Sequence, residues 1–175
     1  MNISVNFKKD AWLYALFAAN LALISIYSPW GSYEVSMFGE TVTVYQWLGG
    51  FVGVFESAIP AAGIEEGWFG SGLSLYTFAF IIASITLLLY FSLRSFRGTK
   101  FGWDWLAYLL TGVAMRAFTT LTLIFEPVPY RAGPIEVLLI GFAPIGIIIA
   151  SLLAIIAFIF AKFGDKIFGR EKPIS

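Results

Sequence analysis

The sequence predicts an all-α integral membrane protein: a four-transmembrane-helix bundle with a small extracellular loop subdomain that contains a β-hairpin. Three observations lead to this fold class. Of the 175 residues, 59% are hydrophobic and only 13% are charged, which is about half the charged fraction of soluble domains. The apolar residues gather in four long runs, and the charges between the runs divide by sign. At a mean hydropathy of +0.83, residues 1–175 are expected to form one membrane domain.

Four apolar runs predict the helices that cross the membrane. They cover residues 11–28, 73–93, 105–125 and 135–161. Each run approaches or exceeds the roughly 20 residues that a helix needs to cross about 30 Å of hydrocarbon. Tryptophan side chains favour the headgroup level of a bilayer, so their positions test these boundaries. Five of them lie within a few residues of a predicted helix end: Trp12, Trp30, Trp68, Trp103 and Trp105.

The first run has an alternative interpretation as a cleaved signal peptide, because Lys8 and Lys9 precede it. The run ends in residues 26–29, Ile-Tyr-Ser-Pro, without the small-residue cleavage site of such peptides. It is also longer than a typical signal-peptide core. We therefore expect it to be retained as the first span.

The charged residues orient the predicted spans. Nine of the eleven cations fall on one side: Lys8, Lys9, Arg94, Arg97, Lys100, Lys162, Lys166, Arg170 and Lys172. The other side has Arg131 as its only cation, with Glu34, Glu40, Glu56, Glu65, Glu66, Glu126 and Glu136. The positive-inside rule then places both termini in the cytoplasm. The sequence thus predicts a multi-pass protein of the cell membrane, with a cytoplasmic tail at 162–175.

The outer loop, residues 29–72, contains the predicted strands. Residues 32–45 alternate between apolar and polar side chains around Gly39-Glu40, which predicts a β-hairpin. Residues 46–62 are apolar but contain Glu56 and Pro60. We expect this stretch to lie at the membrane interface or to fold back. A fifth span would move the basic C-terminal segment to the outside, against the positive-inside rule.

Arg116 is the main candidate for a binding residue. It lies about 14 Å along its helix from Phe125, near the middle of the membrane, where an arginine costs roughly 3 kcal/mol on insertion scales. It could hydrogen-bond backbone carbonyls, Asn20 of the first span, and Thr119 and Thr120 within the bundle, or snorkel. Alternatively, it forms a salt bridge to another subunit or binds an anionic lipid or ligand head group.

The sequence contains no histidine and no cysteine, which excludes Cys/His zinc sites, His- or Cys-ligated haem, iron–sulfur clusters, thiol catalysis and disulfides. It also lacks the glycine-rich phosphate-binding motifs. Glu65-Glu66 is expected to be a solvated turn rather than a cation site. We therefore predict no catalytic residues, no cofactor and no metal, and we expect no nucleic acid as partner.

Residues 27–30, Tyr-Ser-Pro-Trp, lead from the first span into a tyrosine-bearing strand, and residues 47–50, Trp-Leu-Gly-Gly, follow the second strand. With four spans, a large first outer loop and a small second one, the chain resembles the claudin/PMP22 tetraspan superfamily. Trp30 would match the first tryptophan of the family's loop, and Trp47 roughly the second. The family's Gly-Leu-Trp order and cysteine pair are missing here. The resemblance, which covers residues 11–50 in sequence, implies self-association or adhesion, with both tryptophans and the hairpin shaping the outer surface.

The leading functional prediction is a non-enzymatic four-span membrane protein that acts through lateral or extracellular protein contacts. Its expected partners are membrane lipids and either further copies of the chain or other membrane subunits. The first alternative is an accessory, cofactor-free subunit of a larger membrane complex of the respiratory or oxygenase type. The second is a small transporter, channel or lipid-binding or lipid-modifying protein that uses Arg116. It ranks last because the spans contain only one such ionisable group.

Overall fold

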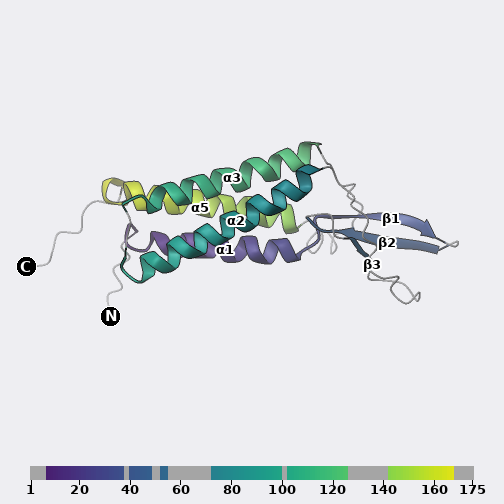
Figure 1. Ribbon diagram of the computed structural model, residues 1–175, viewed down its shortest axis with the longest axis horizontal. Helices are drawn as coiled ribbons and strands as arrows, with labels where there is room; N and C mark the ends of the chain where they lie inside the picture. The colour runs from purple at the N-terminus through teal and green to yellow at the C-terminus, as the bar shows by residue number, and fades with distance from the viewer. Residues whose placement is uncertain are drawn as a thin grey trace, which may run out of the picture.

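The computed structural model describes residues 7–37, 40–48, 52–54, 72–99, 102–125 and 142–167. Its helices are α1 (Ala11–Tyr27), α2 (Gly72–Phe96), α3 (Asp104–Phe125) and α5 (Phe142–Ile167). Its strands are β1 (Gly31–Met37), β2 (Glu40–Gln46) and β3 (Val52–Val54). The helices run side by side as a bundle, and the sheet projects from one end of it (Figure 1).

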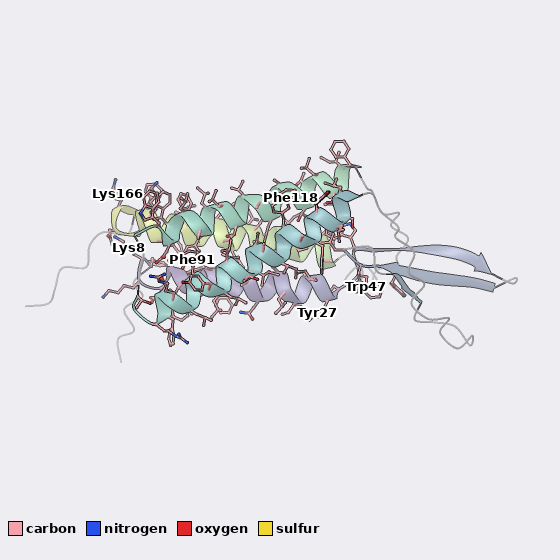
Figure 2. All side chains as sticks on the ribbon, viewed as in Figure 1. Lys8, Tyr27, Trp47, Phe91, Phe118 and Lys166 are labelled. Atoms are coloured by element: carbon pink, nitrogen blue, oxygen red, sulfur yellow. The ribbon has the colours of Figure 1, made fainter. Side chains whose placement is uncertain are left out.

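Each helix of the bundle packs mainly on two neighbours. Helix α1 lies against α2 and α5, and α3 lies against the same two helices from the other side. Helices α1 and α3 therefore occupy opposite corners of the bundle. The two described ends of the chain meet at the end away from the sheet, where Lys8 forms an ion pair with Asp165. In Figure 2, Lys8 and Lys166 both lie at that end. We call it the basic end, because it carries Lys8, Lys9, Arg94, Arg97, Lys162 and Lys166.

Three helices are long and apolar enough to cross a membrane: Leu73–Phe96, Asp104–Phe125 and Ala143–Ile167. Helix α1 is apolar too but has only 17 residues. Large apolar side chains cover the outside of all four helices, as Phe17, Leu110 and Leu152 do, with exposed fractions of 64%, 59% and 49%. Such a surface is unfavourable in water and suited to lipid. The chain is accordingly a membrane protein with transmembrane helices.

Small residues let the helices approach one another inside the bundle. The fully buried alanines are Ala15, Ala18, Ala19 and Ala22 of α1 and Ala150, Ala154 and Ala157 of α5. Gly112 of α3 lies at a close approach of α3 to α5, because a Cβ atom built there would be 3.0 Å from the Ser151 carbonyl oxygen. Since lipid provides little hydrophobic drive between helices, such close backbone packing is a main source of bundle stability.

Two polar side chains connect α2 and α3 in the interior. The hydroxyls of Thr77 and Thr122 are 2.6 Å apart, and both residues are buried. The rings of Phe80 and Phe118 stack beside them with centroids 4.0 Å apart. These contacts hold the sheet-proximal halves of α2 and α3 together.

The strands form an antiparallel sheet in the order β1-β2-β3. The register of β1 and β2 runs from Gly31 opposite Gln46 to Met37 opposite Glu40. These strands lie in the segment for which the sequence predicts a hairpin. Residue 39, at the predicted turn, lies outside the described residues, so the hairpin and its extracellular position stay predictions. Of the stretch 46–62, residues 52–54 add a third strand beside β2.

The helix boundaries agree with those expected from the sequence within three residues, except for the last helix. That span was expected at 135–161, whereas α5 is described from Phe142 to Ile167, and residues 135–141 lie outside the described residues. The helix continues six residues beyond the expected end of the span at 161, into a segment that makes polar contacts. The Lys162 ammonium lies 3.8 Å from the centre of the Trp105 ring, and Asp165 pairs with Lys8.

Candidate functional site

Arg116 lies on the outer face of α3 and is exposed. It is the only charged residue in the middle of a described helix, because the others stand in the first turn of α3, the last turn of α2 or the last two turns of α5, near the basic end. Within the described residues, no hydrogen bond, ion pair or ring contact joins Arg116 to another side chain or to the backbone. The guanidinium therefore faces outward from the bundle, and none of the described residues satisfies its donors.

An open groove of about 430 Å³ surrounds the base of this side chain. Its lining comes from α3 and α5: Val113, Arg116, Ala117, Thr120, Leu121 and Ile155. Apart from the arginine and the Thr120 hydroxyl, these side chains are apolar. The groove thus combines a hydrophobic floor with one fixed positive charge. We call this surface the Arg116 groove.

The two threonines that follow Arg116 point in different directions. Thr120 lines the groove beside Arg116, as its spacing of four residues predicts. Thr119 is fully buried in the bundle, and its hydroxyl has no hydrogen-bond partner among the described residues. Only Thr120 can therefore contribute a hydroxyl to a ligand in the groove.

Asn20 lies on an exposed part of α1. Its side-chain amide donates a hydrogen bond to the carbonyl of Leu16, one turn earlier, at 2.8 Å. Because α1 and α3 stand at opposite corners of the bundle, Asn20 and Arg116 do not meet. The interpretation in which Asn20 satisfies Arg116 inside the bundle does not fit this arrangement.

Trp30 and Trp47 lie where the bundle joins the sheet. Trp30 is only 3% exposed and packs in the core, as does Leu48 at 2%. The indole N–H of Trp47 donates a hydrogen bond to the carbonyl of Tyr27, the last residue of α1, at 3.0 Å. Both labelled partners, Tyr27 and Trp47, lie at the sheet end of the bundle in Figure 2. The buried Trp30 does not shape the outer surface in the way that the family resemblance implies, and both tryptophans anchor the sheet.

A second concave site, which the sequence reasoning did not identify, lies at the basic end. It is a pocket of about 180 Å³ between the ends of all four helices. Its walls include Lys8, Lys9, Trp12, Ser95, Asp104 and Tyr108. A signal was present in the sequence, because Asp104 and Tyr108 stand four residues apart and share one face of α3. Their connection to Ser95 depends on how α2 and α3 pack.

Among the described residues, no group of three or more acidic side chains could hold a metal ion. Glu65-Glu66 lies outside the described residues. The chain matches no protein-family model, and comparison with curated proteins finds no match. The candidate sites of the described residues are thus the Arg116 groove and the pocket at the basic end.

Proposed function

We propose that this chain is a non-enzymatic four-span membrane protein that binds another membrane protein laterally, through the Arg116 groove. The single observation that carries the proposal is that Arg116 faces outward and has no partner among the residues that the structure describes. The leading prediction from the sequence and its first alternative, an accessory subunit, both require that the chain binds another protein.

The four-span topology is part of the proposal. Helix α1, at 17 residues, is about 26 Å long and within the range of the shortest spans. It lies lengthwise against α2 and α5, both apolar enough to cross a membrane. An even number of spans also places the two described chain ends together at the basic end, which the positive-inside rule assigns to the cytoplasm. The sheet would then face the opposite side.

An unpaired arginine against lipid tails is the feature that a partner would relieve. Its insertion is unfavourable by roughly 3 kcal/mol, even after the bilayer has adapted to it. Snorkelling is restricted, because Arg116 stands about 14 Å along the helix from Phe125. A carboxylate on a neighbouring helix would neutralise the guanidinium with two parallel hydrogen bonds. The apolar floor of the groove would pack against the same helix.

A second copy of this chain is a poor candidate for that partner. Within the described helices the carboxylates are Asp104 and Asp165, both near the basic end. Two copies that pack through α3 around a twofold axis would bring their two Arg116 side chains together, which is unfavourable. We therefore infer an unlike partner with an aspartate or glutamate near the middle of a transmembrane helix.

Site-specific photocross-linking in native membranes tests this proposal. A photoreactive amino acid replaces Leu121, in the groove, or Ile24, which is 58% exposed on α1 at the opposite corner. We expect one discrete product with an unlike protein from position 121 and none from position 24. Sequencing that partner should identify a mid-span carboxylate.

Two variants make the test specific. Arg116→Leu should abolish the product at position 121 without lowering the thermal stability of the purified protein, because an unfavourable charge is removed. Arg97→Leu, which removes an exposed arginine at the basic end, should leave the product unchanged. A product that survives Arg116→Leu, or cross-links to lipid alone, would overturn the proposal.

A second candidate function is extracellular adhesion, which the projecting sheet favours. The sheet extends beyond the helices (Figure 1), and the buried Trp30 and the Trp47 hydrogen bond attach it to the bundle. Proteoliposomes that carry the protein with the sheet outward should then aggregate, as measured by light scattering. Proteoliposomes that stay dispersed at high protein density would exclude this function.

A further inference from the structure

Helix α1 has a polar side chain in the middle of the face that points away from the bundle. Asn20 is exposed and lies about 14 Å along the helix from Ala11. Because two residues turn a helix by about 200°, Asn20 stands opposite the buried Ala18 and Ala22. In the four-span arrangement proposed above, its carboxamide therefore lies at the depth of the lipid tails.

The hydrogen-bonding capacity of this carboxamide is only partly used. The side-chain nitrogen of Asn20 donates to the Leu16 carbonyl oxygen at 2.8 Å. The amide has a second N–H and a carbonyl oxygen, and neither bonds to any residue that the structure describes. Asparagine side chains in membrane helices typically hydrogen-bond across to a neighbouring helix. The remaining donor and acceptor thus indicate a polar group on a helix that packs against this face of α1.

Symmetry indicates that a second copy of the chain supplies that group. Two copies inserted in the same orientation are related by a twofold axis along the membrane normal, so a residue on the axis meets its own counterpart at the same depth. Such a pairing is unfavourable for Arg116, because two positive charges would meet. It is favourable for Asn20, because each carboxamide can donate its second N–H to the carbonyl oxygen of the other.

The apolar neighbours of Asn20 form a stripe with the spacing of a helix pair. Phe17, Ile24 and Tyr27 are exposed by 64%, 58% and 78%. With Asn20 they are separated by steps of three, four and three residues, which is the heptad spacing of two helices packed side by side. A single asparagine in such a stripe fixes the register and the number of helices that associate. We call these four residues the α1 seam.

We propose that two copies of this chain pair through the α1 seam, with their Asn20 carboxamides hydrogen-bonded to each other at its centre. Because α1 and α3 occupy opposite corners of the bundle, the Arg116 groove stays open in this dimer. The inference rests on the four-span part of the proposed function and not on the unlike partner. In native membranes, a photocross-link from position 24 would accordingly join the chain to itself and not to an unlike protein.

Disulfide cross-linking of the purified full chain in liposomes tests which face pairs. The chain contains no cysteine, so a single introduced cysteine reports only on its own position. Under mild oxidation, Ile24→Cys should form a covalent dimer, because residues facing each other across the seam come within disulfide range. The matched control is Ile124→Cys, which replaces an isoleucine that is 63% exposed on α3 at the opposite corner. It should stay monomeric.

Energy transfer between donor- and acceptor-labelled copies in the same liposomes tests the role of the carboxamide. Asn20→Leu should weaken dimerisation about tenfold, as expected for hydrogen bonds between membrane helices. Asn20→Gln, which keeps a carboxamide, should retain most of the dimer. Neither change should affect folding of the monomer, because the amide bonds only within its own helix. The control is Thr86→Val on α2, since the exposed Thr86 hydroxyl bonds to the Ile82 carbonyl oxygen of its own helix.

Three outcomes would overturn the proposal. The parent chain could stay monomeric at every protein-to-lipid ratio. Ile124→Cys could cross-link as efficiently as Ile24→Cys, which would mean that the copies collide at random. Asn20→Leu could dimerise as tightly as the parent, which would mean that the carboxamides do not meet.

These outcomes are distinguishable from a failure of the proposed function. The liposomes contain no other protein, so the result does not depend on the unlike partner at the Arg116 groove. The span itself is tested separately with Phe17→Cys. If α1 crosses the membrane, the lipid shields this cysteine from a water-soluble maleimide, whereas rapid labelling would contradict the four-span arrangement.

Discussion

A methyl group added at Gly112 should push α3 and α5 apart. Its Cβ would lie 3.0 Å from Cγ1 of Ile155, 3.0 Å from the carbonyl oxygen of Ser151 and 3.2 Å from Cβ of Ala154. The isoleucine side chain can rotate, but the other two atoms are fixed to the backbone of α5. Relief therefore requires the two helices to separate by a few tenths of an ångström.

The expected effect is a balance of two terms. Overpacking a tight interior typically costs about 1–3 kcal/mol, while replacing glycine by alanine in a helix gains about 1 kcal/mol. Gly112→Ala should thus lower the free energy of unfolding by up to about 2 kcal/mol. Gly112→Val adds two more methyl groups to the same contact and loses much of the helix-propensity gain, so it should lower the free energy of unfolding further.

Reversible unfolding by sodium dodecyl sulfate in mixed micelles, followed by tryptophan fluorescence, measures these differences. Gly102→Ala is the matched control, because a Cβ at Gly102 has nothing within 4 Å. It should stay within about 0.5 kcal/mol of the parent. If Gly112→Ala instead stabilises the protein by about 1 kcal/mol and Gly112→Val is no worse, the close approach of α3 and α5 is refuted.

Two further predictions concern polar contacts. Thr77→Val should lower the free energy of unfolding by about 0.6 kcal/mol, the average for hydrogen bonds between membrane helices, because it removes the bond to Thr122. Thr86→Val should have a smaller effect in the same assay, since that hydroxyl bonds only within its own helix. Trp47→Phe removes the hydrogen bond to the Tyr27 carbonyl, and should speed proteolysis between residues 31 and 46 by roughly twofold to tenfold. An unchanged cleavage rate would mean that this bond does not hold the sheet.

The helices could be predicted from the sequence because hydropathy and helix length depend on local composition. Helices α2 and α3 lie within three residues of their expected positions. The continuation of α5 beyond residue 161 does not follow from the apolar run, and the contact of Asp165 with Lys8 joins residues 157 positions apart. Apolar runs fix where a span lies along the chain and contain little information about distant ion pairs.

The sites were predictable only in part. The depth of Arg116 follows from its position in the span, but the direction of its side chain depends on which neighbours α3 has. Thr119 and Thr120 are adjacent in sequence, and packing separates them into a buried residue and a groove residue. The basic-end pocket was missed because Ser95 and Tyr108 come together only when α2 packs on α3.

The arrangement of the helices has a consequence for the biogenesis of the protein. Helix α1 packs more extensively on α5 than on α2, and the N-terminal Lys8 lies against Gly164, where a Cβ would come within 3.0 Å. Because α1 is synthesised before α5, its alanine face stays uncovered until α5 has emerged. During synthesis that face remains available to insertion factors or to other nascent chains. A ribosome stalled before α5 emerges should thus leave α1 far more susceptible to cross-linking than it is in the finished protein.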